Sequence, residues 1–514
     1  MERMARHAAA FALFFLLFAW RAGDTRIGSG YLDPIGRIGA QDEAVYTHAA
    51  IRMAERGDWL TPRFLDRFFL YKPPLLYWLS GASIEAFGAG AVAARLPSLL
   101  AAAAICAMLL RLAGPLAAGL AAGDFIFASM ARRNMTDMPL AACVAAVAAL
   151  LWRDPRLENP RSRGAVALAI AAAVLIKGVA AAVPVLLLVV CVARERGAWR
   201  RALTAAAAAA VLAAPWFAYQ YAAHPRWFVE EFVGVELLAW GAGAPPQQTS
   251  EAGLAFYPRR LWDWDPALCL LTLAAIPGAI VAARRERRSV PLAWAAVALL
   301  SMSSYQYRNA TYLTLLVPAL AWIAGAYAPM PRFAAAALGV LMLLRLPGPP
   351  AETLAGVDLL ERRCEAGRSN DLIVVNAEDQ FHATVLPIPR VRYAIPGGAQ
   401  PPKGFSLDFK SMGVTVRTAD YLDFANARAR FEPELRAWGL PDAEAFATVI
   451  ALPDPGSLAE LVSGSPGADF LVPAGFAAQL PESPHQRVQG SGGGLLLLSP
   501  GAPSQGKPGR SCRM

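Results

Sequence analysis

Charged and metal-binding residues are scarce in this sequence. Of its 514 residues only 17% are charged, and it contains 5 histidines and 6 cysteines. The cysteines form no CxxC pair, and His and Cys nowhere cluster at the spacing of metal ligands. An internal repeat, a Walker loop and a dinucleotide-binding loop are also absent. These absences weigh against an ATP-driven pump and offer no metal site to predict.

Apolar residues are abundant: they make up 56% of the chain, and the mean hydropathy is +0.37. Repeated runs of Ala, Leu and Val reach membrane-spanning length, which indicates a polytopic helical membrane protein. The net charge of +9 does not indicate nucleic-acid binding, because the basic residues form short clusters between apolar runs. Such clusters are typical of loops that set membrane topology. We therefore expect membrane lipids, and no nucleic acid, among the partners of the chain.

The apolar runs predict roughly eleven membrane-spanning helices. The first follows the charged start MERMARH, and we interpret it as an uncleaved helix that enters from the cytoplasm. Residues 75–88 are apolar but short and contain Glu85, which predicts a helix lying at the membrane interface. The remaining spans are expected at about 95–111, 115–131, 137–152, 164–177, 179–193, 202–219, 267–282, 289–303, 309–328 and 332–346.

The arginine distribution tests this topology. With the N-terminus inside and residues 75–88 at the interface, almost every dense basic cluster falls on the cytoplasmic side, as the positive-inside rule requires. The clusters lie at 111, 153–163, 194–201, 284–288 and 332. The opposite side then holds polar, aromatic-rich segments at 31–74, 131–137, 177–178, 220–265 and 303–309. The sequence therefore predicts an extracytoplasmic site assembled from several loops.

Past about residue 347 the composition changes to that of a small α/β domain, which we place on the extracytoplasmic side at 347–500. The membrane domain is then 1–346, with its first extracytoplasmic loop at about 21–94. Strands are expected at 371–376, 383–389, 469–476 and 494–500, and helices at 442–452 and 456–464. Residues 501–514 are expected to be disordered. Whether Cys364 and Cys512 form a disulfide is left open.

An acidic pair, Asp42 and Glu43, lies in the first extracytoplasmic loop near the expected start of a helix over about 41–57. Acids at a helix N-terminus are favoured by the helix dipole, which is one explanation for the pair. The other is catalytic: a carboxylate facing the membrane cavity serves as general base or stabilises a cationic sugar ring. Tyr46 follows Asp42 by four residues and is expected on the same helix face. We predict Asp42 and Glu43 as catalytic residues and Tyr46 as a substrate-binding residue.

Several cations fall on the same extracytoplasmic side. Lys72 precedes two prolines that fix the chain, so it either anchors to lipid headgroups or binds the phosphate of a lipid-linked substrate. Arg132 and Arg133 break the positive-inside trend, which points to phosphate binding. Asp137 is either a helix cap or a further catalytic acid. The predicted substrate-binding residues are Lys72, Tyr46, Arg63, Arg132, Arg133, Lys177 and Arg308.

Taken together, these segments resemble the membrane glycosyltransferases that use polyprenyl-phosphate sugars. The resemblance is closest to the bacterial aminoarabinose (lipid A) transferase branch, related to the protein O-mannosyltransferases, and covers about residues 30–330. The segments that carry it are DEAVY (42–46), GDWLTPRF (57–64), YKPPLLYWL (71–79), AARLPSLL (93–100), RNMTDMPL (133–140), LIKGVA (175–180), APWF (214–217) and SYQYRNATYLTLLVPAL (304–320).

The resemblance implies an all-α polytopic fold of the GT-C glycosyltransferase type, with a catalytic first extracytoplasmic loop. It makes Asp42 the loop carboxylate, Lys72 the phosphate-binding lysine and Asp137 the second acidic position. The chain departs from the family pattern at Val45, where an arginine is usual, and at Tyr71, where glutamate is frequent. GLAFYPRR at 253–260 replaces a histidine-containing motif. The last two departures remove plausible metal ligands, so no cofactor is predicted.

The predicted function is sugar transfer in a bacterial inner membrane, in one inverting step, from a polyprenyl-phosphate carrier to an extracytoplasmic acceptor. Lipid A or another envelope glycolipid is the expected acceptor, and protein Ser/Thr is the alternative within the class. The non-enzymatic alternative is a transporter or flippase for lipid-linked sugars. Transporters usually show paired repeats and charges near mid-membrane, whereas the charges here gather at one face, which favours an enzyme.

Overall fold

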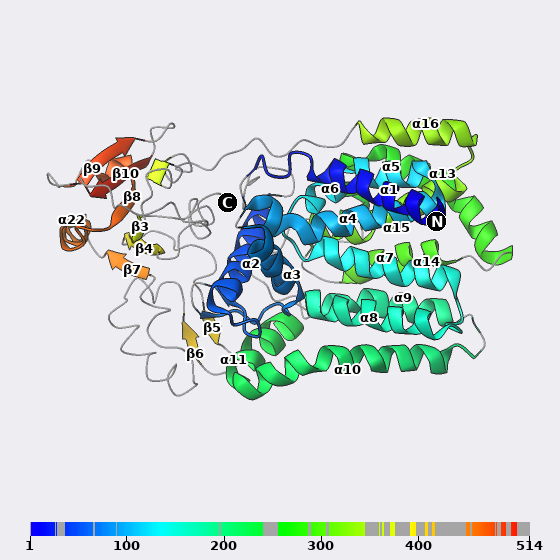
Figure 1. Ribbon diagram of the computed structural model, residues 1–514, viewed down its shortest axis with the longest axis horizontal. Coiled ribbons are helices and arrows are strands. Elements are labelled where there is room, and N and C mark those ends of the chain that lie inside the picture. Colours follow the sequence, from blue (N-terminus) through cyan, green and yellow to red (C-terminus); the bar gives the residue numbers. More distant parts are fainter. Residues whose placement is uncertain are drawn as a thin grey trace.

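The computed structural model contains a bundle of apolar helices and a smaller mixed sheet (Figure 1). It describes residues 2–25, 27, 36–64, 67–88, 90–193, 195, 197–239, 255–285, 289–304 and 308–344 of the helical part. Of the C-terminal part it describes 359, 362–363, 371–375, 391–396, 407–409, 414–416, 449–452, 455–477, 480, 485–489 and 495–500.

Helices occupy all of the predicted apolar runs. They are α1 (Glu2–Ala19), α4 (Ala91–Ala113), α5 (Pro115–Gly123), α6 (Phe125–Ala131), α7 (Asp137–Arg153), α8 (Pro160–Lys177), α9 (Ala182–Val192), α10 (Trp199–Ala223), α13 (Pro266–Arg285), α14 (Val290–Ser304), α15 (Val317–Tyr327) and α16 (Arg332–Leu343). Within the described residues, five helical segments are long and apolar enough to cross a membrane: Ala91–Ala113, Pro160–Val192, Trp199–Ala223, Pro266–Arg285 and Ala310–Tyr327. The chain is thus a mostly helical, multi-pass membrane protein, and the count of eleven crossings stays a prediction.

The segment Pro160–Val192 is a hairpin of two helices, α8 and α9. Arg156, just before α8, donates from Nε to Oε2 of Glu195, just after α9, at 3.1 Å. Because both ends of the segment lie together, the chain reverses within it, at the short 3₁₀ helix η1 (Gly178–Ala181). Gly178 has φ +49°, and a Cβ there would lie 3.3 Å from the Phe232 ring, so glycine suits the reversal. The separate runs predicted at 164–177 and 179–193 agree with this reversal.

Two further helices, α2 (Gly36–Arg56) and α3 (Leu75–Phe87), pack against each other and lie across one end of the bundle (Figure 1). The N-terminus of α1 is at the other end. A helix of 13 residues is about 20 Å long, too short for the hydrocarbon core of a bilayer. This supports the prediction of an interfacial helix at 75–88. A two-stranded hairpin, β1 (Arg63–Phe64) with β2 (Arg67–Phe68), links α2 to α3.

The prediction that Asp42 and Glu43 lie near the start of their helix was wrong. α2 begins at Gly36 and has no acid in its first turn. No proline occurs between Gly36 and Glu43, so nothing in GRIGAQ stops the helix from extending toward the N-terminus. The two acids therefore lie beyond the turn on which the helix dipole acts, and stabilisation by the dipole does not explain them.

The chain between α10 and α13 contains α11 (Pro225–Phe228), the π-helix η2 (Val229–Ala239) and α12 (Phe256–Trp264). η2 is 11 residues long, whereas most π-helical segments are single turns and often occur at functional sites. After α14, the 3₁₀ helix η3 (Ala310–Leu315) leads into α15.

The C-terminal strands form a six-stranded sheet of order β7-β4-β3-β8-β10-β9, which lies beyond the end of the bundle covered by α2 and α3 (Figure 1). The first four strands are parallel to one another, and β10 pairs antiparallel with both of its neighbours, β8 and β9. The strands are β3 (Leu372–Val375), β4 (Val391–Pro396), β7 (Val449–Leu452), β8 (Asp469–Pro473), β9 (His485–Gln489) and β10 (Leu495–Pro500), with a separate hairpin of β5 (Leu407–Phe409) and β6 (Val414–Val416). Helices α22 (Pro455–Gly464) and α23 (Ala474–Ala477) complete the described part.

Strands near 371–376 and 494–500 and the helix near 456–464 were predicted correctly. The strand predicted over 469–476 is correct for Asp469–Pro473, and its last three residues belong to α23. The helix predicted over 442–452 was wrong at its end, because Val449–Leu452 pairs in parallel with β4. A short apolar run does not reveal by periodicity whether it is helix or strand. The strand predicted at 383–389, Cys364, Cys512 and the tail 501–514 lie outside the described residues. The domain boundary at 346 stays a prediction.

Small residues let the helices of the bundle approach closely, as is usual in membranes. A Cβ on Gly119 of α5 would lie 2.0 Å from the carbonyl oxygen of Gly339 in α16. The reverse also holds, since a Cβ on Gly339 would lie 2.5 Å from the carbonyl oxygen of Pro115. The contact is backbone against backbone, so no side-chain rotation relieves it.

We predict that Gly119→Ala forces α16 away from α5 and lowers the free energy of unfolding by about 1–3 kcal/mol, the usual effect of overpacking. The matched control is Gly164→Ala in α8, where no atom lies within 4 Å of the new Cβ. There the change should be neutral or stabilising by up to about 1 kcal/mol, since alanine favours helix. Thermal unfolding midpoints in detergent measure both, and equal midpoints would contradict the packing.

Candidate functional site

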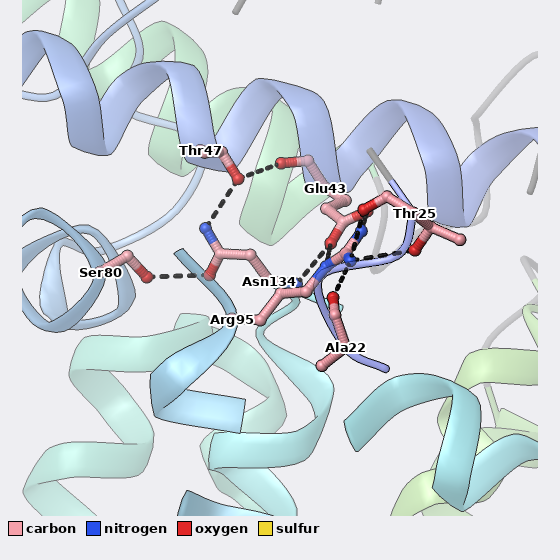
Figure 2. Close-up of polar contacts among 7 residues, drawn as sticks. All are labelled: Ala22, Thr25, Glu43, Thr47, Ser80, Arg95 and Asn134. Carbon is pink, nitrogen blue, oxygen red and sulfur yellow. Dashed lines mark hydrogen bonds and ion pairs between the residues drawn. The ribbon is translucent and has the colours of Figure 1, made fainter. Parts of the chain in front are cut away.

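A buried ion pair lies beneath α2, where it joins the bundle (Figure 2). Arg95 of α4 donates from Nε to Oε1 of Glu43 at 2.7 Å and from Nη2 to Oε2 at 3.1 Å. The backbone N–H of Asn134, between α6 and α7, also donates to Oε1 of Glu43, at 3.0 Å. The side chain of Glu43 is 0% exposed and that of Arg95 is 2% exposed. Both carboxylate oxygens are therefore engaged, in a geometry that fixes α2 against α4.

Arg95 and Arg132 connect the surroundings of the Glu43–Arg95 pair to the end of α1 and the residues that follow it. Nη1 of Arg95 donates to the carbonyl oxygens of Ala22 and Thr25, at 2.6 and 2.9 Å (Figure 2). Nε of Arg132 donates to the carbonyl oxygen of Phe18 at 3.1 Å. The last carbonyls of a helix have no partner within it, and the Phe18 carbonyl is one of these. The first helix is thus held by Arg132 at its last turn and by Arg95 through the residues that follow it.

Asn134 extends the network to α3. Its Oδ1 accepts from the Ser80 hydroxyl, and its Nδ2 donates to Oγ1 of Thr47, both at 2.9 Å (Figure 2). Thr47 in turn donates to the backbone carbonyl of Glu43 at 2.8 Å. Since Asn134 is fully buried, these bonds fix the direction of its amide. We call Glu43, Thr47, Ser80, Arg95 and Asn134 the buried network.

The charges around Glu43 keep it ionised. Burial acts to raise the pKa of this carboxyl, but the positive charges of Arg95 and Arg133 and the hydrogen bond from Asn134 outweigh burial and lower it. Because Glu43 has both oxygens occupied, this placement favours a role in holding Asp42 and its helix. The catalytic assignment of Glu43 stays a prediction.

Lys72 lies three residues before α3 and contacts the π-helix η2. Its ammonium group is paired with Oε1 of Glu236, and the two side chains are 16% and 8% exposed. A second η2 carboxylate, that of Glu231, accepts from the backbone N–H of Leu70 at 2.6 Å. The segment before α3 is therefore held by two carboxylates of one short helix.

Lys177, the last residue of α8, pairs with Asp137, the first residue of α7. Its Nζ is 2.8 Å from Oδ1 of Asp137 and 4.7 Å from the centre of the Tyr312 ring, in a cation–π arrangement. The side chains of Asp137 and Lys177 are 2% and 11% exposed. Asp137 is thus more than a cap of α7, because its carboxylate forms a buried ion pair with another helix.

Two tyrosines lie between these pairs, with Tyr46 of α2 and Tyr77 of α3 at 6.0 Å between ring centres. Burial raises the pKa of both hydroxyls well above the ordinary value, and nearby carboxylates raise it further. For Tyr46 these carboxylates include Asp42, Asp137 and Glu236. We call Asp42, Tyr46, Lys72, Tyr77, Asp137, Lys177 and Glu236 the polar cluster. It gathers two predicted acids, two predicted lysines, both tyrosines and a further glutamate at one end of the bundle.

Arg63 belongs to a different group of side chains. Its guanidinium lies 4.6 Å from the centre of the Phe68 ring, and that ring lies 4.1 Å from the His224 ring, centre to centre, in a tilted arrangement. Asp58 is 3.9 Å from Nε of Arg63. Burial and the Arg63 charge lower the pKa of His224. The Arg63 guanidinium thus lies beside Phe68, whose ring contacts His224 at the end of α10.

The other predicted cations occupy different places. Arg132 caps α1, and Arg133 is buried within electrostatic reach of Glu43. Arg308 lies four residues before Tyr312, and its buried Nε has no hydrogen-bond partner among the described residues. Of the predicted cations, Lys72 and Lys177 are therefore the two that the structure brings into the polar cluster.

Sequence reasoning missed Glu236, Arg95 and Asn134. Glu236 stands in the apolar run VGVELLA, and Arg95 stands near the start of an apolar span, at its predicted extracytoplasmic end. The rule that drew attention to Arg132 and Arg133 would have identified Arg95 too. Asn134 carries no such signal, because its role depends on contacts with two distant helices, α2 and α3. Among the described residues, no group of three or more His, Cys, Asp and Glu could hold a metal ion.

The chain is similar in sequence and in fold to known membrane glycosyltransferases. The family model described as dolichyl-phosphate-mannose-protein mannosyltransferase matches residues 71–219. The undecaprenyl phosphate-alpha-4-amino-4-deoxy-L-arabinose arabinosyl transferase of Yersinia pestis (strain Pestoides F) is 26% identical over 348 residues, which is 62% of this chain. The protein of the same name from Yersinia pseudotuberculosis serotype O:1b (strain IP 31758) matches equally well. The match spans 59% of the length of these curated relatives.

Two crystal structures of ArnT from Cupriavidus metallidurans share the fold. The apo structure has a TM-score of 0.66 at 16% identity and covers 97% of this chain and 98% of its own. The structure bound to undecaprenyl phosphate has a TM-score of 0.66 at 18% identity and covers 98% and 99%. These comparisons confirm the resemblance to polyprenyl-phosphate-sugar membrane glycosyltransferases and the mostly helical membrane fold that it implied.

We predict that Glu43→Ala lowers the free energy of unfolding by about 3–5 kcal/mol, because it leaves the Arg95 guanidinium buried without its carboxylate. The double variant Glu43→Ala/Arg95→Met should lose less, since it buries no unpaired charge. Thermal unfolding of both in detergent tests this, and a single variant at least as stable as the double would contradict it.

The same ion pair predicts a pH dependence. The pKa of Glu43 is lower in the folded state than its unfolded value of 4.5. Its contribution to stability is therefore complete above pH 4.5 and is lost as the pH falls from there through the folded pKa. Wild type should accordingly lose more stability than Glu43→Gln between pH 6 and about pH 3.5.

Proposed function

We propose that this chain, which resembles the polyprenyl-phosphate-sugar glycosyltransferases in motifs and fold, transfers a sugar from a polyprenyl-phosphate carrier to an extracytoplasmic acceptor. The observation that carries the proposal is the polar cluster itself. It sets two lysine–carboxylate pairs, a further aspartate and two tyrosines side by side at the end of an apolar helical bundle. Buried charge of both signs at a membrane surface is characteristic of functional sites.

Lys72 is the proposed ligand of the donor phosphate. An ammonium group binds a phosphate oxygen by charge-assisted hydrogen bonds and stabilises the negative charge that grows on the leaving group. Tyr77 supports this placement, because its buried hydroxyl has no hydrogen-bond partner among the residues that the structure describes. Its pKa is raised, so it remains a proton donor at neutral pH and suits an acceptor oxygen of the substrate.

The proposed reaction is a single displacement with inversion. The acceptor oxygen forms a bond to the anomeric carbon on the face opposite the phosphate, and the carbon–oxygen bond to the polyprenyl phosphate breaks with its electron pair going to the phosphate. Asp42 orients the acceptor, removes its proton when it is a hydroxyl, or stabilises the cationic ring. Asp137, held by Lys177, supports the acceptor or Asp42. The lipid carrier supplies the activated sugar, so no nucleotide takes part.

The proposed acceptor is lipid A or another envelope glycolipid, as the resemblance to the aminoarabinose (lipid A) transferases implies. The curated relatives support this choice of branch, since they are named undecaprenyl phosphate-alpha-4-amino-4-deoxy-L-arabinose arabinosyl transferases. Protein Ser/Thr is the second candidate, because the family model matched by residues 71–219 is that of a protein mannosyltransferase. A flippase for lipid-linked sugars is disfavoured, because the two buried lysine–carboxylate pairs, Lys72 with Glu236 and Lys177 with Asp137, lie at one end of the bundle.

The proposed orientation is a cytoplasmic N-terminus in a bacterial inner membrane, with the polar cluster and the C-terminal sheet in the periplasm. The Arg156–Glu195 pair and the Asp137–Lys177 pair mark opposite ends of α8, which is about 27 Å long. The loops rich in arginine lie at the first of these ends. The positive-inside rule therefore supports this orientation.

We predict that Asp42→Asn and Lys72→Ala each lower sugar transfer from a labelled polyprenyl-phosphate donor by roughly 10²–10⁴-fold. Asp42→Asn removes the charge that orients or activates the acceptor, and Lys72→Ala removes the phosphate ligand. The assay uses membranes with matched expression of each variant. Glu85→Gln, an exposed acid on α3, is the matched control and should transfer at the wild-type rate.

Full activity of Asp42→Asn would contradict the catalytic assignment. Transfer by neither wild type nor control, across several donors and with glycolipid and peptide acceptors offered, would contradict the glycosyltransferase proposal. In that case, movement of a lipid-linked sugar across vesicles would favour the flippase.

A further inference from the structure

Lys72, the proposed phosphate ligand, is already engaged by a carboxylate. Glu236 of η2 pairs with its ammonium group across 164 residues of sequence. Resting on the proposed function, we infer that Glu236 is a positioning residue that competes with the donor: it holds Lys72 in the empty enzyme, and the donor phosphate displaces it. The contact between η2 and residues 70–72 is then the element that the donor must open.

The π-helical winding of η2 explains why Glu236 reaches Lys72. Glu231 and Glu236 are five residues apart, and a π-helix bonds residues five apart, so the two side chains lie on nearly the same side. One accepts from the Leu70 backbone and the other pairs with Lys72. In an α-helix, residues five apart point about 140° away from each other. With Glu231 kept on Leu70, an α-helical η2 would therefore turn Glu236 away from Lys72.

η2 also packs against the chain reversal next to Lys177, the second lysine of the polar cluster. The Phe232 ring stacks on Phe228 at 5.2 Å between centres. It also lies 3.3 Å from the position of a Cβ on Gly178, the residue after Lys177. A bulkier residue than glycine at 178 would push η2 outward. η2 thus packs against both the segment that carries Lys72 and the reversal that follows Lys177.

Charge makes the competition necessary. The carboxylate of Glu236 shares its surroundings with Asp42, since both raise the pKa of Tyr77. A phosphate that arrives at Lys72 adds a further negative charge next to Glu236, and two anions on one ammonium repel each other. With Lys72 only 16% exposed and Glu236 only 8% exposed, solvent screens this repulsion poorly. The phosphate therefore binds at the expense of the Glu236 contact.

A purely structural role for Glu236 leads to the opposite expectation. If the ion pair only holds Lys72 in a productive position, removal of the carboxylate charge frees the lysine and weakens phosphate binding. Competition predicts tighter binding when the charge is removed. The sign of one affinity change therefore separates the two roles.

The experiment measures binding of undecaprenyl phosphate to the full-length chain in lipid nanodiscs, for wild type, Glu236→Gln, Lys72→Ala and the double variant. Glu236→Gln should bind roughly tenfold more tightly, Lys72→Ala should bind more weakly, and the double variant should match Lys72→Ala. Glu195→Gln is the control and should equal wild type. Its side chain is also 8% exposed and paired with a cation, but it lies at the other end of α8.

Unchanged or weaker binding by Glu236→Gln, with Lys72→Ala impaired, would overturn the inference while leaving the proposed function intact. Binding by Lys72→Ala equal to wild type would instead overturn the proposed donor site. If Glu236→Gln does not fold, Glu236→Asp keeps the charge and withdraws it by one methylene. It should tighten binding by a smaller factor, and an unchanged or weaker affinity would again overturn the inference.

Discussion

The buried ion pair between Glu43 and Arg95 is the interaction on which the rest of the site depends. An ionised carboxylate in an apolar interior is stable only when it is paired and hydrogen-bonded, and here Arg95 and Asn134 meet both requirements. Through these two partners the pair connects α1, α2, α3, α4 and the turn before α7. Asp42 immediately precedes Glu43 in α2. The ion pair between Glu43 and Arg95 therefore also fixes the backbone position of Asp42.

In the polar cluster, each lysine is paired with a carboxylate. Lys72 is matched by Glu236, and Lys177 by Asp137, while Asp42 lies near both tyrosines. A site balanced in this way is stable when empty, yet an anionic donor disturbs the balance as soon as it binds. The π-helix that carries Glu236 is a less stable winding than an α-helix, which makes it a suitable element to yield. The buried network thus stabilises the site when it is empty, and η2 is the part that moves to admit the donor.

Sequence patterns predicted most of the helical architecture, because apolar runs and arginine clusters report directly on length and sidedness in a membrane. The sequence patterns failed where the local structure depends on segments that are distant in the sequence. The start of α2 at Gly36 follows from the absence of a stop signal, and Val449–Leu452 became a strand because β4 lies beside it. For the site, Lys72, Lys177, Asp42 and Asp137 were found from their type and place. Glu236 was missed, since only the winding of η2 brings it to Lys72.

The most direct test of the account is a structure of the full-length chain in nanodiscs with undecaprenyl phosphate bound. The account predicts phosphate oxygens within hydrogen-bond distance of Nζ of Lys72, close to the Tyr77 hydroxyl, with the buried pair of Glu43 and Arg95 unchanged. A phosphate bound instead beside Arg63 and His224, with the contact between Lys72 and Glu236 intact, would contradict it.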